Sequence, residues 1–243
     1  MDVFADLVAE QDRLEAILAG LPEDAWVMPS DADGWTIADV VLHLAQTEEA
    51  VVASADAGAP DVSWSLDPRS IDEVMDNLVR AERSTSIPVF ERWRSARRAA
   101  VTALRAADPD QPLAWAAAAL KPRTLGTTRL AEHWAHGLDI TVPLKIAFPD
   151  TDRLRNIAWL GHSTLPYAFS LAGQQPQAVF CELTGPDGTV WSFGPPTADS
   201  TISGPAGAFC RVGARRLTPE ESGLSTTGPH ADTALRLLRN YAA

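Results

Sequence analysis

The first two thirds of the chain place apolar residues at helical spacing. In residues 2–19, apolar side chains recur every three or four positions, the period of one face of an α-helix. The same spacing resumes after Thr36, and Asp39 three residues later makes the pair an imperfect capping box that predicts a helix start. Further helical segments are predicted at about 70–106 with a kink or break at Pro88, at 124–144, and at 152–171 with a bend at Pro166.

The pattern changes after Gly173, at a linker near 174–177 that consists of three glutamines and a proline. Residues 177–184 and 189–193 alternate apolar and polar side chains around Gly-Pro-Asp-Gly, which predicts a β-hairpin. The remaining predicted elements are a strand at 199–203, a helix at 205–216, a strand at 224–227 and a helix at 230–241. We therefore expect a helical domain over 1–173 and a small α+β domain over 177–243.

Composition narrows the class of protein. Hydrophobic residues make up 46% and charged residues 21% of 243, which is sufficient for a packed core. The net charge of −12 argues against nucleic acid or an anionic membrane as the main partner, because both are polyanions. No apolar run approaches the ~18 residues of a membrane-spanning helix, and the N-terminus lacks the basic start of a signal peptide. The pattern does not indicate an oligomeric state.

The chain has two cysteines, Cys181 and Cys210. Two thiols cannot build a disulfide framework, so we expect a reducing, cytoplasmic location. Both lie in apolar strand or helix patterns, where a free cysteine behaves as a small buried hydrophobe. We predict that neither is a metal ligand or a nucleophile.

Glu132 and His136 lie four residues apart on a predicted helix, so their side chains share one face. His43 on the second helix is a natural third ligand, and a set of two histidines and one glutamate suits Zn²⁺ with an open fourth position. Such a site also accepts Ni²⁺ or Fe²⁺. Judged by spacing alone, a glutamate and a histidine four residues apart are more often a solvated pair on the helix surface than metal ligands. His133, a competing ligand, points to a different face and is interpreted as a pocket or surface residue.

Three segments carry a resemblance to a known family. Residues 34–44 (GWTIADVVLHL) resemble the entry of the second helix in DinB-like metal-binding proteins, specifically the mycothiol-dependent maleylpyruvate isomerase family. Residues 129–139 (RLAEHWAHGLD) resemble its second metal motif, and residues 202–210 (ISGPAGAFC) resemble its small C-terminal domain. The resemblance implies an α+β protein with an N-terminal DinB-like four-helix bundle, an extra helix and a small α+β C-terminal domain. It also implies Zn²⁺, or another divalent ion, on the ligands His43, Glu132 and His136.

The resemblance further implies a metal-dependent isomerase or thiol transferase acting on a small molecule, with mycothiol as the thiol. Zn²⁺ stabilises a coordinated thiolate and so supplies a nucleophile at neutral pH. Addition of the thiolate to a conjugated double bond lets that bond rotate, and elimination then returns the trans isomer. The same ion can instead polarise a carbonyl as a Lewis acid.

The resemblance also suggests residues for binding and catalysis. Arg215, in the predicted helix 205–216, is the first choice for a catalytic cation that binds a substrate carboxylate, and Arg83 and Trp115 are assigned to cofactor binding. A solvated helix charge is the alternative for each arginine. The Ala-rich residues 116–119 after Trp115 depart from the Pro- and Ser-rich segment of the related subgroup. Two alternatives therefore stay open: a thiol-independent isomerase or cyclase acting on a natural-product intermediate, and a non-catalytic bundle that binds a metal or ligand.

Overall fold

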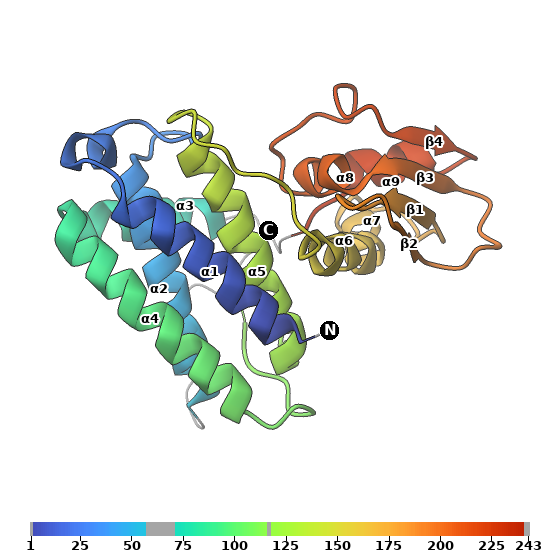
Figure 1. Ribbon diagram of the computed structural model, residues 1–243. Helices are drawn as coiled ribbons and strands as arrows, with labels where there is room; N and C mark the ends of the chain where they lie inside the picture. Colours follow the sequence, from blue (N-terminus) through green and yellow to red (C-terminus); the bar gives the residue numbers. More distant parts are fainter. Residues whose placement is uncertain (1, 57–70, 116–117, 241–243) are drawn as a thin grey trace. The chain divides into compact units, whose positions relative to one another are not determined.

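The computed structural model describes residues 2–56, 71–115 and 118–240, and it divides them into two compact units (Figure 1). The first unit extends to Phe148 and the second begins at Pro149. The elements of the first unit are α1 (Val3–Ala19), the 3₁₀ helix η1 (Glu23–Val27), α2 (Ile37–Ala55), α3 (Ile71–Glu82), α4 (Ser86–Ala106) and α5 (Pro122–Thr141).

Four long helices of the first unit form a bundle, in which α2 packs along α4 and α1 packs along α5 (Figure 1). Helix α2 begins at a capping box, because the Thr36 hydroxyl accepts from the Asp39 amide and the Asp39 carboxylate accepts from the Thr36 amide. Its residues from Ile37 to Ala45 are all buried, so α2 is the central helix of the core. The four-helix bundle with an extra helix, α3, is thus confirmed.

The segment predicted as one kinked helix over 70–106 is two helices. Helix α3 ends at Glu82 and α4 begins at Ser86, so the break lies before Pro88 rather than at it. Pro88 is the third residue of α4, where a backbone N–H would have no partner within the helix, and proline is tolerated there. The proline therefore belongs to the first turn of a helix and does not interrupt one.

The second unit is a small α+β domain, as predicted. Its elements are α6 (Leu154–Ser163), α7 (Leu165–Leu171), β1 (Phe180–Thr184), β2 (Val190–Phe193), β3 (Thr201–Pro205), α8 (Ala206–Gly213), β4 (Ser225–Thr227) and α9 (Ala231–Leu237). The strand order is β2-β1-β3-β4. Strands β1 and β2 form the predicted antiparallel hairpin, whereas β1 and β3 are parallel, with Cys181 opposite Ile202.

Two boundaries in this part of the chain differ from the prediction. The units divide between Phe148 and Pro149 rather than near 174–177, because α6 packs against α8 and α7 against α9. Helices α6 and α7, which were expected in the helical domain, therefore belong to the α+β unit. The helix predicted over 205–216 ends at Gly213, and Arg215 follows it with a left-handed backbone (φ 58°), as is typical just after a helix end.

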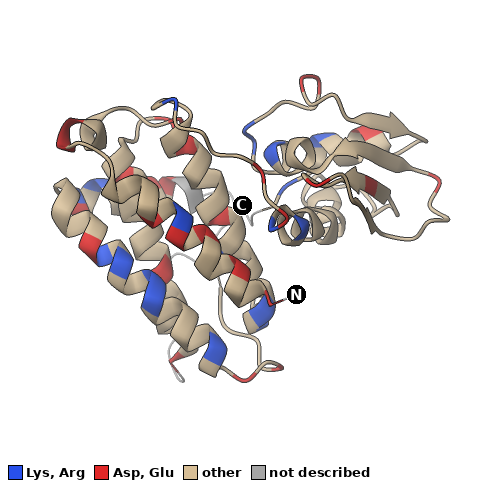
Figure 2. Ribbon diagram, in the orientation of Figure 1, with Lys and Arg blue, Asp and Glu red and all other residues tan. Residues whose placement is uncertain are grey.

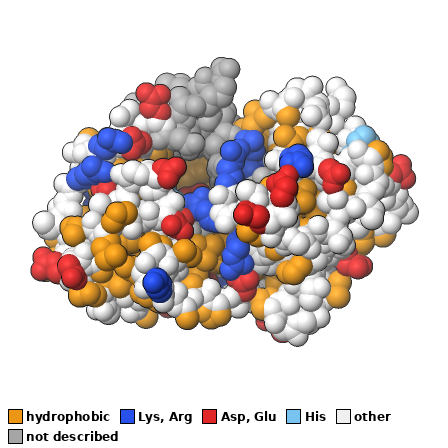
Figure 3. Space-filling model, turned by 90° about the horizontal axis from the view of Figure 1, so that it is seen from above, with side chains coloured by type: hydrophobic (Ala, Val, Ile, Leu, Met, Phe, Trp, Pro, Cys, Tyr) orange, Lys and Arg blue, Asp and Glu red, His pale blue; other side chains and the backbone are white. Residues whose placement is uncertain are grey.

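Charged side chains of both signs are intermixed. Basic residues lie along α4 (Figure 2), and several of them pair with acidic residues of α1: Arg94 and Arg97 with Glu15, and Arg97 also with Asp12. Acidic and basic side chains also lie next to one another on the face seen in Figure 3. Among the described helices, none combines the length and the apolarity needed to cross a membrane.

Candidate metal centre

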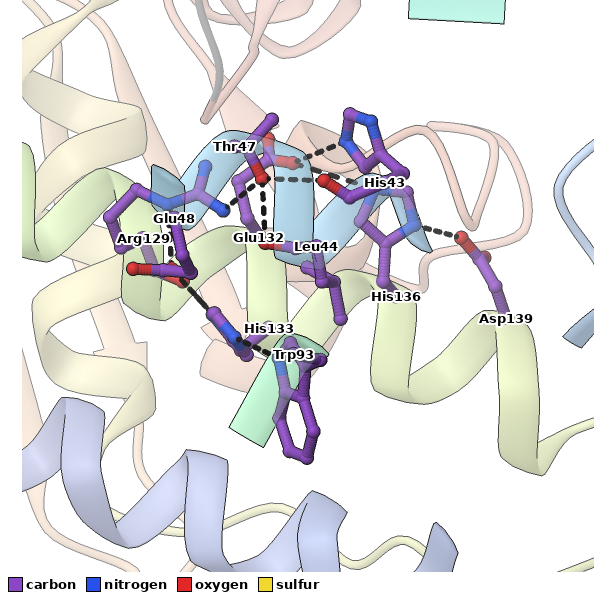
Figure 4. Close-up of polar contacts among 10 residues, drawn as sticks. All are labelled: His43, Leu44, Thr47, Glu48, Trp93, Arg129, Glu132, His133, His136 and Asp139. Carbon is purple, nitrogen blue, oxygen red and sulfur yellow. Dashed lines mark hydrogen bonds and ion pairs between the residues drawn. The ribbon is translucent and has the colours of Figure 1, made fainter. Parts of the chain in front are cut away.

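His43 of α2 meets Glu132 and His136 of α5 inside the bundle (Figure 4). Oε2 of Glu132 lies 3.6 Å from Nε2 of His43 and 3.4 Å from Nε2 of His136. One candidate ligand atom from each residue lies within 4.8 Å of the other two. The structure therefore brings together the three side chains that the spacing and the resemblance singled out.

The geometry of these atoms suits one divalent ion. Bonds of ~2.0–2.2 Å to a tetrahedral Zn²⁺ place neighbouring ligand atoms about 3.3–3.6 Å apart. The two Glu132–histidine separations, 3.4 and 3.6 Å, fall in that range. Two imidazole nitrogens and one carboxylate oxygen form a donor set of the kind found in catalytic zinc sites.

Asp139 is a partner of His136 that the sequence interpretation missed. Its carboxylate Oδ2 lies 2.8 Å from Nδ1 of His136, and its side chain is fully buried. In the neutral form of His136, which is the form that binds an ion, this contact keeps the ring proton on Nδ1 and leaves the lone pair on Nε2, the nitrogen nearest Glu132. The signal in the sequence is the three-residue spacing, which puts both side chains on one helix face. His43 differs, since its buried Nδ1 has no hydrogen-bond partner among the described residues.

His43, Glu132 and His136 shift one another's pKa values. Burial acts to lower the pKa of His136, but the Asp139 and Glu132 contacts outweigh it and raise that pKa to about 9. Burial also acts to raise the pKa of Glu132, but hydrogen bonds from His136 and His43 hold it well below its ordinary value. Burial lowers the pKa of His43. At neutral pH, an ion that binds here must therefore displace a proton from His136.

Trp35, at the turn before α2, forms a wall of the site. Its ring centre lies 5.0 Å from that of His43 and 6.3 Å from that of His136. Its indole N–H donates to Asp76 of α3 at 3.0 Å, and Arg80 pairs with the same carboxylate. The indole is thus anchored by α3 and covers the imidazoles with apolar surface. The sequence interpretation gave Trp35 no role at the site, although it lies in residues 34–44, which resemble the entry of the family's second helix.

His133 is buried in the bundle core, and its interpretation as a pocket or surface residue was wrong. Its Nδ1 donates to the backbone oxygen of Arg129 at 2.8 Å, and its Nε2 accepts from the indole N–H of Trp93 at 3.2 Å. Burial, with the nearby Arg129 charge, lowers the pKa of His133 to about 3. Both ring nitrogens are occupied, so His133 is not available as a ligand of an ion at the centre.

The two residues predicted to bind a cofactor lie in the first unit. Arg83 follows α3, and it donates to Asp39 Oδ1 at 2.9 Å and to the Gly34 backbone oxygen at 3.2 Å. It therefore holds the turn that contains Trp35. The Trp115 ring lies against α5, with Cζ of Arg129 5.8 Å from its centre. Residues 116–117 of the loop after Trp115 lie outside the described residues.

The predicted catalytic cation and both cysteines lie in the second unit, whereas the three candidate ligands lie in the first. Arg215 is exposed. Burial raises the pKa of the Cys181 thiol to about 12 and raises that of Cys210 as well. A thiol with so high a pKa is a poor nucleophile at neutral pH.

Comparisons with known proteins identify the family of the chain. A family model described as the mycothiol maleylpyruvate isomerase N-terminal domain matches residues 7–141, which include all three candidate ligands. Two relatives from Mycobacterium tuberculosis are each 33% identical over 242 residues, covering 98% of this chain and 94% of the relative. They are the uncharacterized proteins Rv0036c (strain ATCC 25618 / H37Rv) and MT0041 (strain CDC 1551 / Oshkosh).

The fold also matches solved structures. A crystal structure of the mycothiol-dependent maleylpyruvate isomerase superposes with a TM-score of 0.62, covering 93% of this chain and 95% of that one. A histidine-to-alanine mutant of that enzyme gives the same values. The sequence identity to both is 14%, so these matches show a shared fold.

Proposed function

The chain belongs to the mycothiol maleylpyruvate isomerase N-terminal domain family, and from this membership we propose that it is a metal-dependent enzyme acting on a small molecule with a low-molecular-weight thiol. We propose mycothiol as the thiol and Zn²⁺ as the ion, held by His43, Glu132 and His136. The reaction is cis–trans isomerisation of a conjugated carboxylate, or transfer of the thiol to an electrophile.

One observation carries the metal part of the proposal. One carboxylate oxygen of Glu132 lies near an imidazole nitrogen from each of two helices. Both separations match the spacing between two ligand atoms of one tetrahedral Zn²⁺. A solvated Glu–His pair, the alternative from spacing alone, does not require a second histidine from another helix at the same oxygen. The presence of His43 there favours a metal centre.

A divalent ion at this centre would act as a Lewis acid and lower the pKa of a coordinated thiol or water. The protein's own residues support that chemistry. The Asp139 carboxylate accepts a hydrogen bond from Nδ1–H of His136, so Nε2 is the nitrogen that would bind the ion. Trp35 shields the two imidazoles with apolar surface, which strengthens electrostatic interactions at the centre.

We further propose that Arg215 binds the substrate carboxylate. Its side chain is exposed, and its guanidinium is a permanent cation suited to paired hydrogen bonds with a carboxylate. Arg83 is a weaker candidate for ligand binding than its sequence position indicated, because it is engaged by Asp39 and Gly34. We propose that it contributes by holding the turn that contains Trp35.

The decisive experiment combines metal analysis with a thiol-dependent assay. The purified protein is expected to hold about one divalent ion per chain by mass spectrometry of its metals. It should isomerise a cis-unsaturated dicarboxylate such as maleylpyruvate with mycothiol present, and EDTA should abolish turnover. A protein that takes up no divalent ion would overturn the proposal. Metal-dependent turnover without any thiol would favour the isomerase or cyclase alternative.

A further inference from the structure

A buried ion pair joins the two helices that carry the candidate ligands. Nε of Arg129 on α5 donates to Oε1 of Glu48 on α2 at 2.9 Å, and their side chains are 2% and 0% exposed. The other carboxylate oxygen of Glu48 is buried without a partner among the described residues. Arg129 is therefore the cation that compensates the buried charge of Glu48.

The same arginine reaches the backbone of a candidate ligand. Nη2 of Arg129 donates to the Thr47 hydroxyl at 2.7 Å, and that hydroxyl lies 2.8 Å from the backbone oxygen of His43, to which it donates (Figure 4). Arg129 precedes Glu132 by three residues and Thr47 follows His43 by four, so the contacts lie one helical turn from the centre. A chain of hydrogen bonds thus runs from α5 to the peptide unit of His43.

A third helix joins this network through His133. The backbone oxygen of Arg129 accepts from His133, and His133 accepts from the indole of Trp93 on α4. The buried polar groups therefore fix α2, α4 and α5 against one another beside the centre. Such a network has demanding geometry, since each donor and acceptor must keep its partner inside the core.

We propose that Arg129 and Glu48 are positioning residues, whose cross-link sets the separation and rotation of α2 against α5 so that His43 meets Glu132 and His136. The inference rests on the proposed function, because it requires that the centre holds an ion. A buried ion pair is a poor source of stability, since apolar residues of similar volume often replace it without loss. The hydrogen bonds of Arg129 are directional, so they can hold one helix in a fixed position against the other.

The test separates placement from stability with a double variant. The single variants Arg129→Met and Glu48→Met each disturb a buried charge pair, so both should lower the melting temperature. The double variant Arg129→Met/Glu48→Met removes both charges and should recover that temperature. Its affinity for Zn²⁺ should nevertheless fall roughly ten- to a hundredfold, the usual cost of losing residues that orient ligands. The visible spectrum of Co²⁺ bound in place of Zn²⁺ should change as well.

Arg97→Met is the matched control. Arg97 is also a buried arginine, but it pairs with Asp12 and Glu15 and so joins α4 to α1, neither of which carries a candidate ligand. Its loss should lower the melting temperature and leave Zn²⁺ affinity and the Co²⁺ spectrum unchanged. A fall in affinity equal to that of the double variant would overturn the inference, because general loosening of the bundle would then explain both.

A double variant that folds and binds Zn²⁺ with wild-type affinity would overturn this inference but not the proposed function. A wild-type protein that binds no ion would overturn the proposed function as well. Should the double variant fail to fold, Thr47→Val decides, since it removes only the hydroxyl link to His43. It should weaken Zn²⁺ binding severalfold and Thr47→Ser should restore it, whereas wild-type affinity in Thr47→Val would overturn the inference.

Discussion

The carboxylate of Asp139 lies 2.8 Å from Nδ1 of His136, one turn earlier on α5. The contact fixes the orientation of one imidazole, while Nδ1 of His43 has no partner among the described residues. The two histidines of the candidate centre are therefore supported unequally. Removing the support of His136 is the most direct probe of how the site is built.

Asp139→Leu should weaken Zn²⁺ binding by roughly ten- to a hundredfold, because His136 loses the acceptor that fixes its tautomer. Asp139→Asn, whose amide oxygen still accepts, should lose less. Isothermal titration with Zn²⁺ measures both changes. Asp24→Asn, at an exposed position of η1, is the control and should bind as wild type. Equal affinity in all three variants would show that Asp139 does not support the ion.

The metal-free protein should lose stability as the pH rises from 6.5 to 9. The pKa of His136 is raised to about 9 in the folded protein, so the folded state holds a proton that the unfolded state releases near pH 6.5. The stabilisation is complete below pH 6.5 and disappears as the pH passes 9. It amounts to about 3 kcal/mol, because the folded pKa lies about 9 and the unfolded one near 6.5.

Urea denaturation in EDTA at pH 6.5 and 9 measures this loss. Other groups titrate over the same range, so the relevant quantity is the difference between the wild-type protein and Asp139→Leu. The variant should lose less stability over the interval. A loss as large as that of the wild type would contradict the role given to Asp139.

His136→Ala should abolish binding of the ion, and His133→Ala should retain about one ion per chain. His133 uses both ring nitrogens inside the core, so its loss leaves the buried indole N–H of Trp93 without its acceptor. That loss should cost about 2–4 kcal/mol of unfolding free energy. Metal analysis and denaturation of the two variants separate the effects. Equal loss of the ion in both variants would show that the centre has been assigned to the wrong face of α5.

The double variant Cys181→Ala/Cys210→Ala should keep its ion and its turnover. Both thiols are fully buried, and burial raises the pKa of Cys181 to about 12. In the folded wild-type protein, a thiol reagent such as DTNB should react with neither cysteine until the chain is unfolded. Rapid reaction of the native protein, or loss of turnover in the variant, would give the protein's own thiols a role.

Arg215→Ala should lower kcat/KM roughly ten- to a hundredfold for a carboxylate substrate and leave the ion bound. A charge-assisted hydrogen bond contributes ~1.5–3 kcal/mol, which corresponds to that range. Arg155→Ala, an exposed arginine of α6, is the control and should leave kcat/KM unchanged. Unchanged kinetics in Arg215→Ala would remove this residue from substrate binding.

Much of the fold could be predicted because it rests on local pattern. Helix α2 follows from its capping box and apolar spacing, and the hairpin β1–β2 from its turn residues. The juxtaposition of Glu132 and His136 follows from the four-residue spacing alone. His43 needed either the tertiary fold or a resemblance, because it lies on another helix.

The errors have a common physical origin in tertiary contacts. The assignment of α6 and α7 to the bundle was wrong because their partners are α8 and α9, which periodicity does not identify. His133 was misplaced for a similar reason. His133 occupies the core with both ring nitrogens hydrogen-bonded, and one of its partners, Trp93, lies forty residues away in sequence.

The distance along the chain between the candidate ligands has a kinetic consequence. Roughly 90 residues separate His43 from Glu132, so the three donors converge only after α2 and α5 have paired. A chain in which those helices are still apart offers an ion no more than the two donors of α5. The free energy of metal binding should therefore appear mainly as slower unfolding and scarcely as faster folding. In this way an ion would prolong the lifetime of the native protein without guiding its formation.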